Sequence, residues 1–324
     1  MKMSIGFDVS KETVDVAFFD GNKMEHFQIK NSKMGFAQVY TKSRKGDIEE
    51  YIITMEATGV YHQRLAEFFY KKGYLVSIVN PLIVKRYAEM KMMRAKTDKV
   101  DSKLIAQYGF YEKSFPYKEI SENRQKIKAF LNAIDDLQQT KIQNKNRLEA
   151  LSHKANTMIE IEKIYKDINN HINQQIKQIE KKVRILSKDE NLEEYQNLLS
   201  IPGIGERIAA AVIGHFGTLD DFTTVKQVVS FIGTNPSPRT SGSSVRGRGS
   251  ISRKGSRYLR KLFYMAALSA SKYNSDCIRL YQRMLDKGKD KKVALIAVAN
   301  KLIRQVFAIV KYKRGYDPNF LSTN

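Results

Sequence analysis

The order of the apolar segments in the first 80 residues constrains the fold more than any other feature of the chain. Three strand-like segments come first, over 4–10, 13–19 and 24–29, with Asp20-Gly21-Asn22 as a turn signal before the third. A helix over 33–44, a buried strand over 51–55, a helix over 60–72 that ends at Gly73, and a strand over 75–79 follow. The sequence therefore predicts an antiparallel meander that continues into alternating helices and strands.

This order is that of a ribonuclease-H-like fold, in which the first and fourth strands are neighbours. Asp8 lies in the first strand and Glu56 lies just past the end of the fourth, so we expect their carboxylates to converge. An Asp at a strand end can instead cap a turn. However, a carboxylate among apolar residues costs free energy unless a cation or another partner compensates its charge.

A second acidic pair opens a helical run downstream. Asp98 and Asp101 are three residues apart and share one face of a helix. A helix start alone would explain both, with Asp98 as N-cap and Asp101 in the first turn. Taken alone, the helix start is the favoured interpretation, although two carboxylates flanked by Lys and Arg also suit a divalent cation beside a phosphodiester. We interpret this pair, together with Asp8 and Glu56, as a one-metal or two-metal phosphoryl-transfer site.

The charge balance predicts a polyanionic partner. The 324 residues carry 56 Lys+Arg against 34 Asp+Glu, a formal net charge of +22. No apolar run is expected to be long enough to span a bilayer, and the N-terminus does not resemble a signal peptide, so nucleic acid is favoured over a membrane. The single Cys277 fits a reducing compartment, and the five His residues show no zinc spacing. We expect a cytoplasmic, nucleoid-associated protein.

The segment from 119 to 187 has the spacing of a coiled coil. No Gly or Pro occurs between Pro116 and Pro202, and apolar residues recur at steps of three and four from Ile161 to Leu186. A reversal is predicted near 152–156, and two arrangements stay open: a helical hairpin, or one long dimerising helix. Either would form an arm, over about residues 119–190, that joins subunits.

The C-terminal part predicts a mainly helical nucleic-acid-binding domain over about residues 195–324. Gly203 and Gly205 lie in a segment, 201–209, that resembles the hairpin of helix-hairpin-helix elements, whose next helix offers free N–H groups to a phosphate. An ordinary helix–helix turn is the alternative. From Phe222 to Ser275 there is no Asp or Glu. The basic residues that we expect to contact nucleic acid there are Arg239, Arg246, Arg248, Arg253, Lys254, Arg257 and Arg260.

Within this basic run, residues 235–249 are rich in Gly, Ser and Pro and predict a loop. Its hydroxyl groups could simply satisfy turns. The functional interpretation is an exposed serine among guanidinium groups that attacks a phosphate while Arg neutralises the developing charge. No His or Asp nearby suggests a protease-type triad.

Three segments resemble the signature blocks of the DEDD transposases, the insertion-sequence family often called IS-one-ten, which includes the Piv and MooV DNA invertases. These are residues 6–11, 56–59 and 96–101. The resemblance implies a RuvC-like domain whose carboxylates Asp8, Glu56, Asp98 and Asp101 bind Mg²⁺, with Mn²⁺ as the alternative. Ser241-Gly242 and the segment 251–260 resemble the family's C-terminal motif and imply a covalent serine–DNA link through Ser241. Because Gly242 is followed by serine and not by a second Gly, Ser243 and Ser244 stay open as nucleophiles.

The sequence thus predicts an α/β plus α protein with three parts: a RuvC-like domain (about 1–115), a coiled-coil arm and a C-terminal serine-bearing domain. We expect a DNA transposase-recombinase that forms homo-oligomers, and the resemblance implies guidance by a structured bridge RNA. The alternatives are a RuvC-like Holliday-junction nuclease, in which metal-activated water attacks, and a non-catalytic DNA-binding scaffold.

Overall fold

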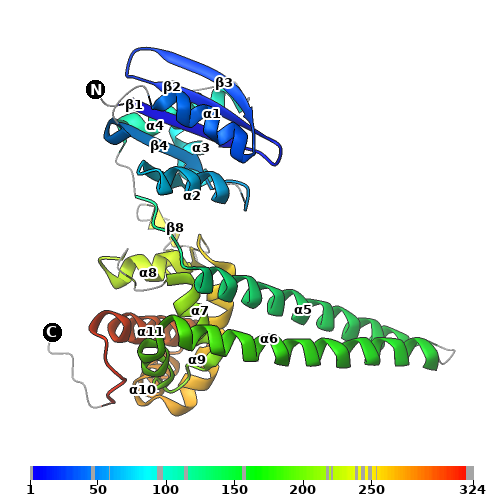
Figure 1. The fold of residues 1–324 in the computed structure, drawn as a ribbon. Coiled ribbons are helices and arrows are strands. Elements are labelled where there is room, and N and C mark those ends of the chain that lie inside the picture. The colour runs from blue at the N-terminus through cyan, green and yellow to red at the C-terminus, as the bar shows by residue number, and fades with distance from the viewer. Residues whose placement is uncertain are drawn as a thin grey trace. The chain divides into compact units, whose positions relative to one another are not determined.

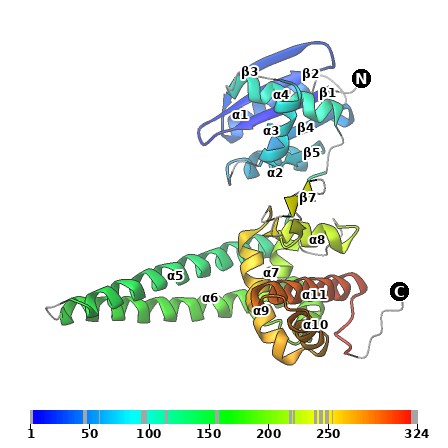
Figure 2. The same cartoon turned by 180° about the vertical axis from the view of Figure 1, so that it is seen from behind.

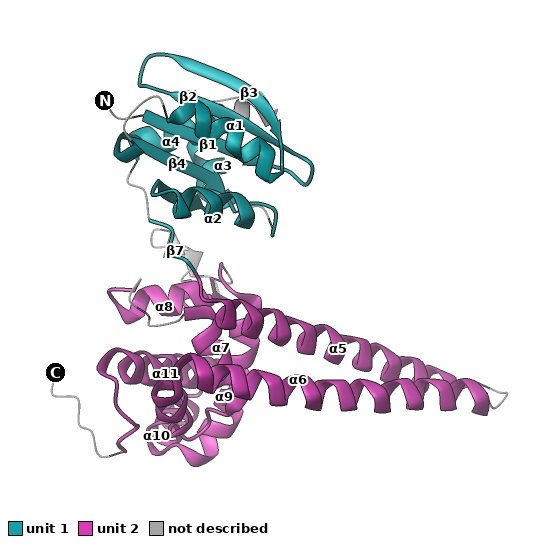
Figure 3. Ribbon diagram, viewed as in Figure 1, with its two compact units in different colours: residues 1–119 teal, residues 120–324 magenta. Residues whose placement is uncertain are grey.

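The structure of the chain is a computed structural model that describes residues 3–44, 48–57, 59–92, 98–112, 116–154, 158–216, 219, 222–237, 240–241, 245–246, 250–252 and 254–318. Only the backbone is described for 98–100, 237, 240–241, 245–246 and 250. The chain divides into two compact units, unit 1 over Met1–Glu119 and unit 2 over Ile120–Asn324 (Figure 3).

Unit 1 is built on a five-stranded mixed sheet (Figure 1). Its strands are β1 (Met3–Val9), β2 (Thr13–Phe19), β3 (Met24–Lys30), β4 (Tyr51–Glu56) and β5 (Leu75–Val79). Their order in the sheet is β3-β2-β1-β4-β5. The first three strands pair antiparallel, whereas β1 pairs parallel with β4 and β4 with β5. The predicted strands and the pairing of the first with the fourth are confirmed.

Helices cover both faces of this sheet. They are α1 (Lys33–Ser43), the short 3₁₀ helix η1 (Ile48–Glu50), α2 (Gln63–Lys71), α3 (Pro81–Met90) and α4 (Asp98–Tyr111). Residues of α1 and α2 form the main core with one face of the sheet, and α4 packs on the other face. Helix α3 was not predicted from the sequence. It begins at Pro81, and the side chain of Asn80, its N-cap, accepts a hydrogen bond from the Leu82 amide.

Side chains of β1 alternate between the two faces of the sheet, and their size determines how closely a helix can approach each face. Ile5, Phe7 and Val9 are buried in the core with α1 and α2. The residues between them, Gly6 and Asp8, therefore belong to the face that α4 covers. A Cβ atom at Gly6 would lie 2.3 Å from the Ala106 nitrogen and 2.3 Å from the Ser102 oxygen, so glycine allows α4 to lie directly on the sheet.

Unit 2 is mainly helical (Figure 2). Its helices are α5 (Glu122–Ser152), α6 (Ile159–Leu199), α7 (Glu206–Phe216), α8 (Val225–Ile232), α9 (Arg257–Tyr273), α10 (Ser275–Asp286) and α11 (Lys291–Tyr312). Helix α7 is central to the core, because the whole run from Ala209 to Ile213 is buried. Helices α8 and α10 add to the closing helices that the sequence predicted.

Helices α5 and α6 form a helical hairpin, one of the two arrangements that the sequence left open. Ile134 on α5 packs against Ile172 and Ile176 on α6. Helix α6 is interrupted at Asn191, whose backbone is non-helical at φ −161° and ψ 93°. The side chain of Asn191 accepts a hydrogen bond from the Glu194 amide at 3.0 Å and so caps the segment that follows.

Helix α11 is long and apolar enough to cross a membrane by length and composition, with a mean hydropathy of 1.8. The prediction that no apolar run is long enough to span a bilayer is therefore wrong by these two criteria. In the structure Ala294, Val298 and Leu302 of this helix are fully buried in the core of unit 2. Core packing therefore accounts for its apolar character.

Candidate active site

The structure places Asp8 and Glu56 next to each other at one edge of the sheet. The parallel register of β1 and β4 pairs Phe7 with Met55, and Asp8 and Glu56 are the next residues on each strand. Both belong to the face that α4 covers, because Gly6 and Thr54, two residues earlier, contact that helix. Both side chains are half-buried.

Helix α4 runs antiparallel to these two strands. A Cβ atom at Gly109, near its end, would lie 2.8 Å from the Ser4 hydroxyl on β1, whereas one at Gly6, two residues further along that strand, would meet Ser102 and Ala106. Movement along β1 and β4 toward Asp8 and Glu56 is therefore movement toward the first turn of α4. Asp101 lies in that turn and is half-buried. Asp98 is the first residue of α4, and its side chain lies outside the described residues.

These residues fit a divalent cation by the chemistry of their donors. Carboxylate oxygens are the ligands that Mg²⁺ and Mn²⁺ prefer, and several carboxylates at one edge repel each other unless a cation compensates them. Among the described side chains, no three His, Cys, Asp or Glu residues are grouped closely enough to hold a metal ion. The Asp98 side chain is not among these, so the candidate site rests on the backbone placement of β1, β4 and α4.

Asp15 is an acidic residue on the same face that sequence reasoning missed. It lies directly opposite Asp8 in the antiparallel register of β1 and β2 and is 7% exposed. Its carboxylate accepts hydrogen bonds from Gln28 Nε2 at 2.9 Å and lies 2.8 Å from His26 Nε2. An Asp between Val14 and Val16 is the same signal that identified Asp8 on its own strand.

Ser241 belongs to unit 2, so the acidic and serine parts of the predicted site come from different units. The segment around Ser241, predicted as a loop, contains two short antiparallel ladders. Strand β6 (Pro236–Ser237) pairs with β9 (Ser250–Ile251), and β7 (Thr240–Ser241) pairs with β8 (Val245–Arg246). For Ser241 and Arg246 the structure describes the backbone and not the side chain. Five other predicted residues lie wholly outside the described residues: Arg239, Ser243, Ser244, Arg248 and Arg253.

The two glycines of the predicted hairpin have different surroundings. Gly203 has φ +104°, and a Cβ atom there would lie 2.6 Å from the Cβ of Ala270 on α9. Packing against α9 therefore accounts for Gly203 without any phosphate. A Cβ atom at Gly205 would have open space, since nothing lies within 4 Å of it.

The described basic residues of this region also differ. Lys254 and Arg257 are exposed. Arg260 is half-buried, and its Nη1 donates a hydrogen bond to the Ile232 carbonyl at 3.1 Å. Arg260 therefore connects α9 to the end of α8, whereas the other two are available at the surface.

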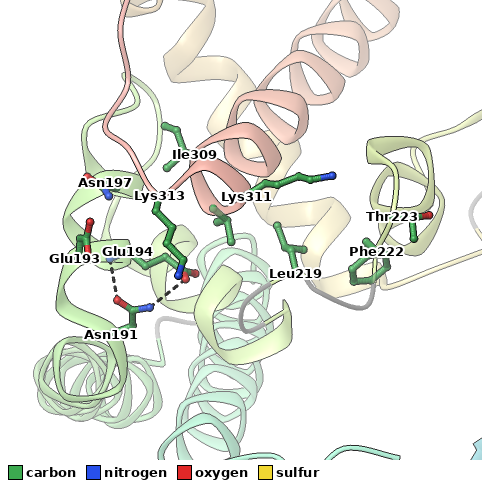
Figure 4. A pocket seen from close by; sticks show the side chains of 11 residues that line it. Asn191, Glu193, Glu194, Asn197, Leu219, Phe222, Thr223, Ile309, Lys311 and Lys313 are labelled. Atoms are coloured by element: carbon green, nitrogen blue, oxygen red, sulfur yellow. Dashed lines mark hydrogen bonds between the residues drawn. The ribbon is translucent and has the colours of Figure 1, made fainter. Parts of the chain in front are cut away.

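A pocket of about 470 Å³ lies where α6 is interrupted, between the end of that helix and α11 (Figure 4). Its lining includes Asn191, Glu194, Leu219, Lys311 and Lys313. None of the predicted catalytic residues is part of this described lining. We assign the pocket no role in the chemistry.

Two family profiles match the chain. Residues 5–154 match a profile described as "Transposase", and residues 195–282 match one described as "Transposase IS116/IS110/IS902 family". Together they span both units.

Three curated proteins illustrate the similarity. The chain is 30% identical over 322 residues to a pilin gene-inverting protein of Moraxella bovis, covering 98% of each chain. The corresponding protein of Moraxella lacunata is equally similar. A probable family 20 transposase of Pseudomonas aeruginosa is 29% identical over 126 residues, or 38% of this chain and 37% of that protein.

Proposed function

Because this chain belongs to the IS116/IS110/IS902 family of transposases and is an enzyme that acts on DNA, we propose that it cuts and rejoins DNA strands through a serine nucleophile. The observation that carries the proposal is the convergence of three backbone segments. The ends of β1 and β4 and the first turn of α4 bring Asp8, Glu56, Asp98 and Asp101 toward one edge of the sheet.

These four residues are proposed to hold Mg²⁺, with Mn²⁺ as the alternative, in a RuvC-like domain. When bound, the ion would act as a Lewis acid and stabilise negative charge on phosphodiester oxygens. The strand order β3-β2-β1-β4-β5, with helices on both faces, supports this assignment because it is the order expected of a ribonuclease-H-like sheet.

Ser241 is proposed to attack a DNA phosphodiester. Its Oγ gives up a proton and bonds to phosphorus, while one P–O bond to the DNA chain breaks and the released oxygen takes up a proton. One phosphoester bond forms as another breaks, so the phosphoserine link conserves the bond energy that is needed to join the DNA to a new strand. Arg246, paired with Thr240 in the adjacent ladder, is a candidate for neutralising charge at this phosphate.

The proposed organisation has a catalytic domain over about 1–115, an arm over about 119–190 and a serine-bearing domain over about 195–324. Ile161, Ile164 and Ile168 on α6 are all more than 40% exposed and recur at steps of three and four. This apolar stripe supports pairing of arms into a homo-oligomer. The net charge of +22 supports binding of DNA and of a structured guide RNA. A cytoplasmic, nucleoid-associated location is part of the same proposal.

The deciding experiment is a denaturing gel of protein incubated with element-end DNA and its guide RNA, in Mg²⁺ or in EDTA. We expect a protein–DNA adduct in Mg²⁺ that disappears in EDTA and in Ser241→Ala. The variants Ser243→Ala and Ser244→Ala serve as matched controls and should keep the adduct.

Other outcomes identify the alternatives. Free cut ends that survive Ser241→Ala would favour a RuvC-like junction nuclease that uses water. DNA binding without cleavage, unaffected by Asp98→Ala, would favour a non-catalytic scaffold. An adduct lost only in Ser243→Ala or Ser244→Ala would move the nucleophile to that residue.

A further inference from the structure

A cluster of basic and hydrogen-bonding side chains lies on unit 2, where the start of α5 packs against α7. A Cβ atom at Gly214 of α7 would lie 2.9 Å from Ile127 and 3.5 Å from the Cγ of Lys128, so the Lys128 stem lies along α7. The next residue of α7, His215, has its ring centroid 5.9 Å from that of Tyr258 on α9. Three helices therefore contribute to one cluster.

Two cations in this cluster have no counter-charge among the residues that the structure describes. Among the described residues, neither Arg124 nor Lys128 of α5 takes part in a salt bridge, although both are half-buried. Three carboxylates of α5 and α7 have cationic partners of their own: Glu122 pairs with Lys126, Glu206 with Arg184 and Asp135 with Lys261. Glu190 of α6 accepts a hydrogen bond from the Ser121 hydroxyl at the start of α5. Burial, together with Arg124, lowers the pKa of Lys128. Uncompensated, half-buried cations cost folding free energy.

Hydrogen-bond donors in the same cluster also lack acceptors among the described residues. Within the described part of the chain, Arg124 Nε, His215 Nε2 and the Tyr258 hydroxyl are buried without a hydrogen-bond partner. Burial and Lys128 lower the pKa of His215 to about 4, and burial raises the pKa of Tyr258 to about 12. Both groups are therefore neutral near pH 7, and each can donate a hydrogen bond. Buried donors without acceptors are rare in proteins, so each one calls for an explanation.

We propose that Arg124, Lys128, His215 and Tyr258 form a binding site for one phosphodiester group of a nucleic acid backbone. A phosphodiester has the negative charge that the two cations lack and the acceptor oxygens that the unpaired donors lack. The surrounding sequence is strongly basic, since 222–275 contains no Asp or Glu. The inference rests on the proposed function, because that function brings nucleic acid to unit 2.

Lys128→Gln in the full-length protein tests this site, with Lys126→Gln as the matched control. Both variants remove one positive charge from the same stretch of α5, but Lys126 is paired with Glu122 at 2.7 Å. The measurement is affinity for element-end duplex DNA and, separately, for the element's structured RNA over a range of salt concentrations. We expect Lys128→Gln to weaken binding roughly tenfold and to reduce the log–log salt slope by about one. Lys126→Gln should change affinity less than about twofold.

Thermal unfolding shows whether a variant binds nucleic acid more weakly because it has lost a phosphate contact or because it is less stably folded. Lys128→Gln removes an uncompensated cation, so we expect it to melt at the wild-type temperature or above. Arg124→Gln provides a second variant, and its effect on affinity should not add fully to that of Lys128→Gln because both residues contact one phosphate.

The two nucleic acids identify the source of the phosphate. A loss confined to DNA, a loss confined to RNA, or a loss with both would each support the site. Wild-type affinity and salt slope in both Lys128→Gln and Arg124→Gln, for both ligands, would overturn it while leaving the proposed function intact. If the wild-type protein itself binds neither ligand, the proposed function fails first.

Discussion

Asp15 illustrates how an acidic residue on an apolar strand is kept in place by its neighbours. Its two carboxylate oxygens are engaged separately, one by His26 and the other by Gln28. Cross-strand like charges are unfavourable, and Asp15 lies directly opposite Asp8. The partners on β3 therefore fix the Asp15 side chain beside a residue that is proposed to bind metal.

We expect Asp15→Ala to lower the free energy of unfolding by about 1–3 kcal/mol, because it leaves His26 and Gln28 without their acceptor. Asp15→Asn keeps one acceptor oxygen and should recover part of this loss. Urea denaturation of both variants checks the prediction. Equal stability of Asp15→Ala and the wild-type protein would contradict a structural role for the network.

His215 makes the stability of unit 2 depend on pH in a defined direction. Its pKa is lowered to about 4 in the folded chain from an ordinary value of 6.5. Between these values the unfolded chain binds more protons than the folded one, so stability falls as the pH falls through this window. The full effect is roughly 3 kcal/mol, at about 1.4 kcal/mol per pKa unit.

His215→Gln cannot titrate and should therefore lose less stability than the wild-type protein between pH 6.5 and pH 4. Denaturation midpoints at several pH values measure the difference, to which the carboxylates common to both proteins contribute equally. Parallel pH profiles for the two proteins would show that His215 is not protonated differently on unfolding.

At the scale of elements, the turn between α6 and α7 provides a matched pair of glycines. Gly203→Ala forces a side chain into a left-handed backbone and against Ala270 at 2.6 Å, whereas Gly205→Ala meets open space. We expect Gly203→Ala to cost about 3 kcal/mol or more and Gly205→Ala less than about 1 kcal/mol. Thermal unfolding of the two variants checks this, and equal losses would contradict the packing that the structure assigns to Gly203.

Sequence patterns predicted some elements better than others for identifiable reasons. The strands of unit 1 were predictable because Ile5, Phe7 and Val9 alternate with small or polar residues, as a two-sided sheet requires. Helix α3 was missed because Pro81 was interpreted as the end of the preceding strand, although proline is also favoured as the first residue of a helix. The ladder of β7 and β8 was missed because Gly, Ser and Pro are typical of loops.

Other features could not be decided from the sequence at all. The apolar seam of α5 and α6 would pair equally well within one chain or between two, so only the structure distinguishes the hairpin. For the proposed site, the sequence predicted Asp8 and Glu56 because carboxylates interrupt apolar strands there. The pairing of Asp15 with His26 depends on the register of β2 with β3, which no local pattern specifies.

At the scale of the whole molecule, each unit has its own core. The core of unit 1 surrounds Phe7 and Phe69, and that of unit 2 surrounds α7. Units with separate cores commonly unfold separately, so we expect two transitions in calorimetry of the full chain. Gly203→Ala should lower only the transition of unit 2 and so identifies which is which.

Mg²⁺ should then raise only the other transition. A ligand that binds the folded state stabilises it by RT ln(1 + [L]/Kd), about 2.7 kcal/mol at one hundred times Kd, and the proposed ligands all belong to unit 1. Asp8→Asn and Asp101→Asn remove ligand charge and should abolish the shift, whereas Asp20→Asn, in an exposed turn of the same unit, should keep it. A shift that persists in Asp8→Asn, or that moves the transition of unit 2 instead, would place the cation away from the edge where β1, β4 and α4 meet.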